Sequence, residues 1–157
     1  MFHIVLFEPR IAFNTGNIIR LCANTGSELH LIKPLGFNFE ESNLRRAALD
    51  YRDLANVSEY DNFVSYTEKH SERRILAITP HAEKSYTSTE FDELDSLLFG
   101  SEDTGLPQSI IDKIPSEHCL RIPMMPGNRS LNLSNAASIV TYEAWRQLLF
   151  VGDVNCQ

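Results

Sequence analysis

Short apolar runs, each four or five residues long, recur along the chain with helix-length segments between several of them. The runs occupy residues 3–7, 28–32, 74–78, 96–99 and 118–122, and a weaker one lies at 55–59. Runs this short and this rich in Val, Ile and Leu are typical of strands buried on both faces. Helix-length segments lie at 15–25, 61–70, 107–113 and 134–149. The alternation predicts an α/β fold in which helices flank a mostly parallel, six-stranded sheet.

Length and composition predict one domain over residues 1–157. A chain of 157 residues buries about two-thirds of the surface that its unfolded form exposes, which is enough for a hydrophobic core. Hydrophobic residues make up 43% of the sequence, and no repeat, low-complexity tract or Gly/Ser-rich linker interrupts it. This composition argues against both a disordered chain and a multidomain one.

The N-terminal sequence MFHIVLFEPR has no basic flank and no small-residue cleavage site, and no apolar stretch approaches the roughly 20 residues that span a bilayer. We therefore expect a cytoplasmic protein. The three cysteines, Cys22, Cys119 and Cys156, are far apart and form no C-x-x-C pair. Reduced, structural cysteines are expected rather than disulfides or a zinc site.

The histidines and the overall charge argue against two further classes of protein, metal-binding proteins and general nucleic-acid-binding proteins. His3, His30, His70, His81 and His118 show no ligand spacing such as H-E-x-x-H, so no metal site is expected. The net charge of −7 argues against general nucleic-acid binding, because phosphate contacts require a positive surface. A nucleic-acid partner would have to meet a local basic patch.

The first predicted helix carries polar side chains on one face. We expect Asn14 to be its N-cap and Gly26 to end it, since Asn is favoured at helix starts and glycine adopts the left-handed conformation found at helix ends. Asn17, Arg20 and Asn24 stand at positions i, i+3 and i+7 and so share a face. The opposite face is mainly apolar, so Arg20 should point away from the helix's core side.

Two loops follow the last two apolar runs and are the expected ligand site, because ligands of open α/β sheets bind outside the carboxyl ends of the strands. The loop FGSEDTGLP lacks the Lys-Ser/Thr pair of a phosphate-binding P-loop, and no G-x-G-x-x-G follows the first run. Nucleoside triphosphatases and the usual dinucleotide enzymes are thereby disfavoured. In the second loop, PMMPGNRSLNLSNAAS, small residues before the last helix would let another backbone or a ligand approach closely.

The stretches NTGNIIR, FGSEDTG and SLNLSNAASIVTYEAWRQL resemble the three motifs of the SPOUT superfamily of RNA 2′-O-methyltransferases. Nearly the whole chain resembles the small members that modify the wobble nucleotide, cytidine or modified uridine, in the anticodon stem-loop of leucine tRNAs. The resemblance implies a Rossmann-like α/β domain with a deep C-terminal trefoil knot, S-adenosylmethionine (product S-adenosylhomocysteine) as cofactor, and no metal. It also implies a homodimer whose site uses both chains, with the first and last helices, including Tyr142 and Trp145, at the interface.

By position, the resemblance also assigns site residues. Arg20 is the catalytic position, holding a phosphate and the nascent alkoxide, since arginine is not deprotonated in proteins. Asn14 would orient Arg20, and Glu102 would orient loop amides or Arg20. The full catalytic set is Arg20, Asn14, Glu102 and Asn132; the cofactor set is Ile78, Thr79, Gly100, Ile122, Ser130 and Leu131; the RNA set is Arg45, Arg46 and Arg129.

Several of these residues also have structural interpretations. Ser130 and Asn132 could cap the last helix. Gly100 either leaves room for the adenine ring or forms a turn at a strand end. Arg20 could bridge helices, Glu102 could be a solvated loop carboxylate, and the Arg45–Arg46 pair a solvated helix face.

The chain departs from the family pattern at three places. A positive charge is absent from the segment Ser101–Thr104, Ala12 and Phe13 stand where prolines are usual, and residues 79–82 lack an expected lysine and glycine. These departures keep two other interpretations open: a non-catalytic module that binds RNA or senses S-adenosylmethionine, and a metabolite enzyme without an RNA partner.

Overall fold

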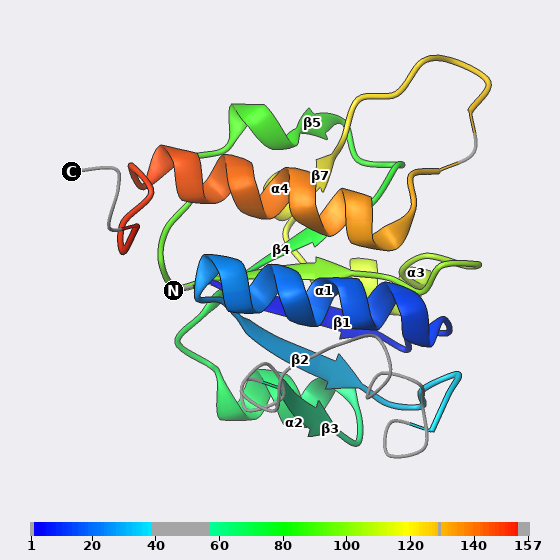
Figure 1. Ribbon diagram of the computed structural model, residues 1–157. Helices are drawn as coiled ribbons and strands as arrows, with labels where there is room; N and C mark the ends of the chain where they lie inside the picture. The colour runs from blue at the N-terminus through cyan, green and yellow to red at the C-terminus, as the bar shows by residue number, and fades with distance from the viewer. Residues whose placement is uncertain (1, 39–56, 129, 154–157) are drawn as a thin grey trace.

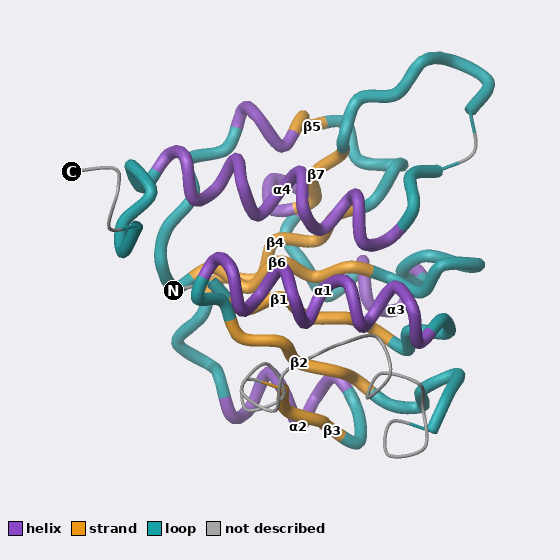
Figure 2. The backbone as a smooth tube through the Cα atoms, viewed as in Figure 1, coloured by secondary structure: helices purple, strands orange, loops and turns teal. Residues whose placement is uncertain are grey.

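The computed structural model describes residues 2–38, 57–128 and 130–153, which form one layer of parallel strands between two layers of helices (Figures 1 and 2). The seven strands of its sheet are arranged in the order β3-β2-β1-β6-β4-β7-β5, and every neighbouring pair is parallel. The strands are β1 (His3–Phe7), β2 (Glu28–Ile32), β3 (Val57–Tyr60), β4 (Arg74–Ile78), β5 (Lys84–Ser85), β6 (Asp95–Phe99) and β7 (Cys119–Arg121). The predicted α/β class and parallel sheet are confirmed.

The sheet has one strand more than the six expected. β5 has only two residues, Lys84 and Ser85, which form the edge of the sheet and pair with β7. Such a short polar segment has no apolar run by which a sequence could reveal it. The weak run at 55–59 corresponds to β3, of which residues 57–60 are described.

Both faces of the sheet are covered, which explains why the strands read as continuous apolar runs. Along β1, Ile4 and Leu6 point into the cluster beneath α1 (Ala12–Thr25) and α4 (Leu133–Gln147). Val5, between them, points into the cluster beneath α2 (Phe63–Lys69) and α3 (Gln108–Ile111). The short 3-10 helices η3 (Tyr86–Ser88) and η4 (Ser116–His118) complete the elements.

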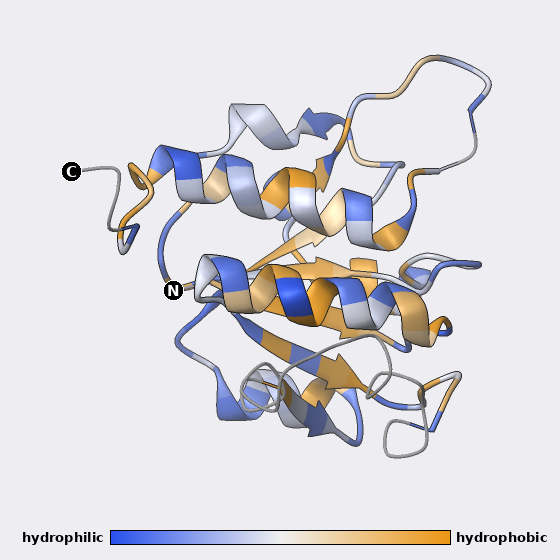
Figure 3. Ribbon diagram, viewed as in Figure 1, coloured by the Kyte–Doolittle hydropathy of each residue, from blue (hydrophilic) through white to orange (hydrophobic). Residues whose placement is uncertain are grey.

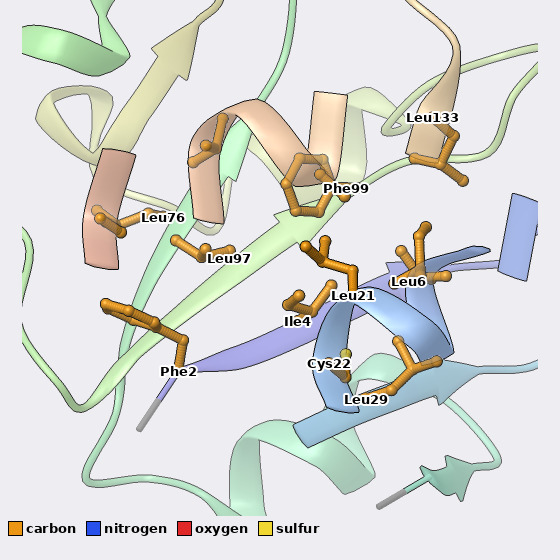
Figure 4. Packing of buried hydrophobic residues seen from close by; sticks show 14 of the residues in the cluster. Phe2, Ile4, Leu6, Leu21, Cys22, Leu29, Leu76, Leu97, Phe99 and Leu133 are labelled. Carbon is orange, nitrogen blue, oxygen red and sulfur yellow. The ribbon is translucent and has the colours of Figure 1, made fainter. Parts of the chain in front are cut away.

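The larger core cluster joins the central strands to the helix pair α1 and α4, which also contact each other. Figure 4 shows Leu6, Leu97 and Phe99 from the sheet meeting Leu21 of α1 and Leu133 of α4. The central strands are also the most hydrophobic part of the ribbon in Figure 3. The helices that carry the first and third sequence motifs are therefore fixed on one face of the sheet.

The predicted end and exposed face of α1 are confirmed, but its predicted start is wrong. Gly26 ends the helix at a φ of 64°, and its amide donates to the Cys22 carbonyl. Asn17, Arg20 and Asn24 are exposed on one face. The N-cap is Ile11 and not Asn14, which lies buried in the first turn. The helix begins earlier because a distant carboxylate binds the amides there, as shown below.

The described cysteines, Cys22 and Cys119, are both free and buried, as expected of structural thiols. Burial raises the pKa of the Cys22 thiol to about 12 and raises that of Cys119 as well. Cys156 lies outside the described residues. Among the helices that the structure describes, none is long and apolar enough to cross a membrane.

An ion pair joins β4 to β6 at their amino ends. Arg74 donates through Nε and Nη2 to the two carboxylate oxygens of Asp95, both at 2.7 Å, and the carboxylate side chain is 0% exposed. Asp95 also accepts from the Asp92 amide at 2.8 Å. Removing one partner of a buried pair leaves the other charge uncompensated, which is more costly than losing a surface pair.

We predict that Arg74→Ala lowers the free energy of unfolding by about 3 kcal/mol, the lower end of the range for broken buried pairs, because Arg74 itself is 37% exposed. Urea unfolding followed by circular dichroism measures this. Arg146→Ala, which breaks an exposed pair with Glu143, is the matched control and should change stability far less. Equal effects of the two substitutions would contradict the assignment.

Candidate active site

A cavity of about 750 Å³ lies at the carboxyl ends of β4, β6 and β7. At this end of the sheet each parallel strand continues into the loop that follows it. Ile78 and Phe99 are the last residues of β4 and β6, and Ile122 directly follows β7. Apolar side chains form part of the wall. The lining residues are Ile11, Asn14, Ile78, Thr79, Pro80, His81, Phe99, Gly100, Ser101, Glu102, Asp103, Thr104, Gly105, Leu106, Ile122, Met124, Ser130, Leu131, Asn132, Leu133 and Ala136.

The loop after β6 closes on itself into a compact turn. Ser101 and Gly105 exchange backbone hydrogen bonds, and Gly105 has a φ of 69° that favours glycine. The Ser101 hydroxyl lies 3.0 Å from a carboxylate oxygen of Asp103 and 2.8 Å from the hydroxyl of Thr104. The hydrogen bond from Ser101 lowers the pKa of the Asp103 carboxyl. The loop thus holds its own shape and presents a charged carboxylate at its tip.

Gly100 is required by the packing of this loop, as one of its two interpretations held. A Cβ at Gly100 would lie 2.1 Å from the Gly105 carbonyl carbon and 2.2 Å from the Leu106 nitrogen. Both contacts are with backbone atoms, which cannot move aside as a flexible side chain would. The turn at the strand end therefore requires a glycine. Gly100 also lines the cavity, and its role in leaving room for an adenine ring stays a prediction.

Glu102 binds the start of α1 from a loop far away in the sequence. Its Oε2 accepts from the Arg10 amide at 2.7 Å, and its Oε1 accepts from the Ile11 amide at 3.2 Å. Helix amino termini expose unpaired amides and favour negative charge. Because the side chain of Ile11 cannot accept a hydrogen bond, the Glu102 carboxylate supplies the anion that the helix's own first residues lack.

Asn14 and Asn132 extend this contact to α4. Asn14 donates through Nδ2 to Glu102 Oε1 at 3.0 Å, and its Oδ1 accepts from Asn132 Nδ2 at 2.9 Å. Asn132 in turn caps α4, because its Oδ1 accepts from the Ser134 amide at 2.9 Å and from the Ser134 hydroxyl at 2.7 Å. We call Glu102, Asn14 and Asn132 the polar relay. It joins the three segments that carry the sequence motifs.

The structure brings most of the predicted site residues to this one cavity. All six residues of the cofactor set line it, as do Asn14, Glu102 and Asn132 of the catalytic set. Arg20 lies outside that lining, exposed on α1. Arg45, Arg46 and Arg129 lie outside the described residues.

The capping interpretation is correct for Asn132, which is the N-cap of α4. Glu102 holds loop amides, one of the two roles expected for it. Asn14 bridges Glu102 and Asn132 through its side-chain amide. Its role in orienting Arg20 stays a prediction.

Sequence reasoning did not single out several lining residues. His81 and Pro80 come from the loop after β4, where the buried Thr79 accepts a hydrogen bond from the His81 amide at 3.4 Å. The departure from the family pattern at 79–82 was the signal that this loop contacts the site. Ala136 lines the cavity from the first turns of α4, where small residues were expected to permit close approach.

The sequence matches the SpoU rRNA Methylase family over residues 1–142. A curated relative from Methylovorus glucosotrophus (strain SIP3-4), named tRNA (cytidine(34)-2′-O)-methyltransferase, is 51% identical over 154 residues, which cover 98% of this chain and 100% of the relative.

Solved structures share the fold. One, described as giving structural insights into the 2-OH methylation of C/U34 on tRNA, superposes with a TM-score of 0.87 at 41% identity and covers 94% of this chain and 96% of that one. The SpoU methyltransferase AviRb from Streptomyces viridochromogenes, in complex with the cofactor AdoMet, superposes with a TM-score of 0.79 at 21% identity, covering 93% of this chain and 57% of AviRb. At that identity the second likeness concerns the fold alone.

We predict that Glu102→Ala destabilises the start of α1, because two backbone amides and the Asn14 amide lose their acceptor. The free energy of unfolding should fall by about 1 kcal/mol, as for the loss of a helix cap. Hydrogen exchange should accelerate at residues 10–15. Glu68→Ala, at an exposed position on α2, is the control. If the amides of residues 10–15 were equally protected from hydrogen exchange in both variants, Glu102 would not be what stabilises the start of α1.

Proposed function

The chain belongs to the SpoU rRNA methylase family, and from this we propose that it methylates the 2′-hydroxyl of the wobble nucleotide, position 34, of tRNA. The observation that carries the proposal is the 51% identity, over nearly the whole of both chains, to a relative named for this reaction. The cavity at the carboxyl ends of the strands supports it, because the three motif segments meet there. Within this proposal the substrate is cytidine or modified uridine in leucine tRNAs, and the protein acts in the cytoplasm as one knotted domain.

S-adenosylmethionine fits the cavity as the methyl donor. A volume of about 750 Å³ lies within the roughly 300–1,000 Å³ of small-molecule sites. Ile78, Ile122 and Leu131 offer an apolar wall for an adenine ring, while Thr79 and Ser130 offer hydroxyl groups at its margin. When bound, the cofactor supplies an electrophilic methyl group on a sulfonium. The described loops would hold it largely through backbone groups at the strand ends.

Methyl transfer to a ribose hydroxyl is an in-line displacement, so the protein contributes mainly positioning and stabilisation of the oxygen as it loses its proton. Arg20 is proposed to hold a phosphate of the substrate and the developing alkoxide with its permanently charged guanidinium. Glu102, Asn14 and Asn132 act differently. Their hydrogen bonds to one another support a role in fixing the cavity wall on which the methyl donor would rest.

The position of Arg20 supports a site that is completed by a second copy of the chain. Arg20 shares the exposed face of α1 with Phe13, which is 69% exposed, and the neighbouring α4 exposes Tyr142 at 45%. Large exposed apolar side chains on two packed helices are typical of a protein interface. In a homodimer formed through α1 and α4, the guanidinium of one protomer would reach the cavity of the other.

The RNA contacts and the C-terminal knot are the remaining parts of the proposal. Arg45, Arg46 and Arg129 are proposed to bind phosphates, in keeping with a local basic patch on a chain of net charge −7. The trefoil knot is supported by the family and by the passage of residues 130–133 beside the loop after β6 at the cavity. Nucleoside mass spectrometry of leucine tRNAs from cells with and without the protein tests the substrate and the nucleotide.

We predict that Arg20→Ala lowers methyl transfer to leucine tRNA by at least about a hundredfold, as expected when a charge that stabilises the reacting oxygen is removed. Binding of S-adenosylmethionine, measured by calorimetry, should be unchanged. Lys113→Ala, an exposed cation beyond α3, is the control. Undiminished turnover of Arg20→Ala would remove this residue from the mechanism, and cofactor binding by the unaltered protein without methylation of any tRNA would favour a non-catalytic module.

We predict complementation if the site uses two chains. Arg20→Ala and Asn132→Ala should each be nearly inactive alone, whereas subunits mixed one to one and allowed to exchange should regain about a quarter of the unaltered activity, because half the dimers then carry one complete site. The measurement is methyl transfer before and after exchange, with light scattering to confirm the dimer. A stable, active monomer, or no recovery after exchange, would contradict a shared site.

A further inference from the structure

Three histidine rings gather at the opposite end of the sheet from the cavity. His3 is the first residue of β1, His30 lies in the middle of β2, and His70 directly follows α2. The amino ends of β1 and β2 and the end of α2 lie on the side away from the cavity (Figure 1). His3 and His30 are buried, with ring centroids 4.0 Å apart, and the His70 ring lies 4.7 Å and 5.2 Å from them. One ring nitrogen from each residue lies within 4.8 Å of the other two.

One ring nitrogen of each histidine contacts a tyrosine hydroxyl. His3 Nδ1 lies 3.0 Å from the Tyr66 hydroxyl, which also contacts Ser96 Oγ at 2.7 Å. His30 Nδ1 and His70 Nε2 both contact the Tyr60 hydroxyl, at 3.1 Å and 2.9 Å. Metal-binding histidines usually donate their second ring N–H to a carboxylate, a backbone carbonyl or a water, which fixes the tautomer and the orientation of the ring. Here a tyrosine hydroxyl can accept such a bond from each ring.

One nitrogen of the cluster lacks a hydrogen-bond partner within the described part of the chain. It is the buried His30 Nε2. A buried polar atom of this kind is rare and calls for a ligand or an ordered water. The Glu28 carboxylate lies close to two of the rings, with Oε2 at 3.7 Å from both His3 Nε2 and His30 Nε2.

From this geometry we propose that the cluster of His3, His30 and His70 binds a zinc ion, with the Glu28 carboxylate as the fourth ligand. Three imidazoles and a carboxylate suit the tetrahedral preference of Zn²⁺, whereas Mg²⁺ and Ca²⁺ require mostly oxygen ligands. A site with four protein ligands is structural rather than catalytic. The ion would join β1, β2 and the end of α2.

Ligand spacing indicates which group moves on binding. Zn–N bonds of about 2.0–2.1 Å place tetrahedral ligands about 3.3 Å apart, so the nitrogens, now within 4.8 Å of one another, must move closer together. His70 ends a short helix and is only partly buried, and Glu28 is 57% exposed. His3 and His30 are held in place by β1 and β2 and would bind the ion first. His70 and Glu28 can then move toward the ion and complete its coordination.

Two cations and two anions face the cluster from the elements packed around it. Lys69 and Arg73 are the cations and oppose the charge of a bound metal ion, while Glu28 and Glu72 are the anions that offset them. Lys69 lies over the Tyr60 ring and Arg73 lies 3.9 Å from Glu72.

Calorimetric titration of tag-free, chelator-treated protein with ZnCl₂ tests the proposal, with Co²⁺ as a second probe because tetrahedral cobalt absorbs strongly in visible light. We expect one ion per chain, a melting temperature that rises with zinc, and tetrahedral cobalt bands. His70→Gln and Glu28→Gln should each weaken zinc binding at least tenfold. The matched control, His118→Gln, replaces a histidine near β7 that lies outside the cluster and should bind as the unaltered protein does.

The proposal is overturned by the absence of saturable one-to-one binding, or by equal zinc affinity in His70→Gln and His118→Gln. Circular dichroism shows whether each variant is folded, and Glu28→Gln, at an exposed position, provides the second readout should His70→Gln unfold. Neither result depends on methyl transfer. One-to-one zinc binding that His70→Gln and Glu28→Gln weaken and His118→Gln leaves unchanged is the outcome that supports the proposal.

Discussion

The Glu102 carboxylate is the contact on which the site's shape depends. It binds two backbone amides at the start of α1 and the side chain of Asn14. Neither Ile11 nor the first turn of α1 contains an acidic side chain, so this anion comes from the loop after β6. Asn132 extends the same hydrogen-bonded chain to the start of α4. Displacing the start of α1 would therefore remove hydrogen bonds from the other two segments, and displacing either of those would remove hydrogen bonds from α1.

This dependence explains how a rigid sheet can carry a cavity formed mostly by loops. Strand ends leave the sheet with unpaired backbone groups, and loops that border them would otherwise be free to collapse into the space. Here the loop after β6 is closed by its own hydrogen bonds between Ser101 and Gly105, and it is attached to both helices by the polar relay. The two helices are fixed in turn by the core beneath them, which includes Phe99 at the end of β6.

The sequence allowed the sheet to be predicted well and the contacts between loops only in part. Runs such as residues 3–7 were recognisable because burial on both faces removes polar residues from a strand. The start of α1 was misplaced because its anion lies 92 residues from Arg10, and no local signal reports such a partner. The family resemblance identified residues that meet at the cavity, but it could not show why Gly100 is glycine. The cluster of His3, His30 and His70 was missed since its residues lie in three separate elements.

The departure from the family pattern at residues 101–104 affects what the loop presents more than how it folds. Ser101, Asp103 and Thr104 bond to one another, so the turn keeps its shape without the usual positive charge. The Asp103 carboxylate, whose pKa is lowered by the hydrogen bond from Ser101, places an anion at the exposed tip. A polyanionic substrate would be repelled there, whereas a cofactor held by backbone groups deeper in the cavity would not. The consequence of this substitution should therefore fall on the binding of RNA, and basic residues elsewhere on the surface must supply the attraction.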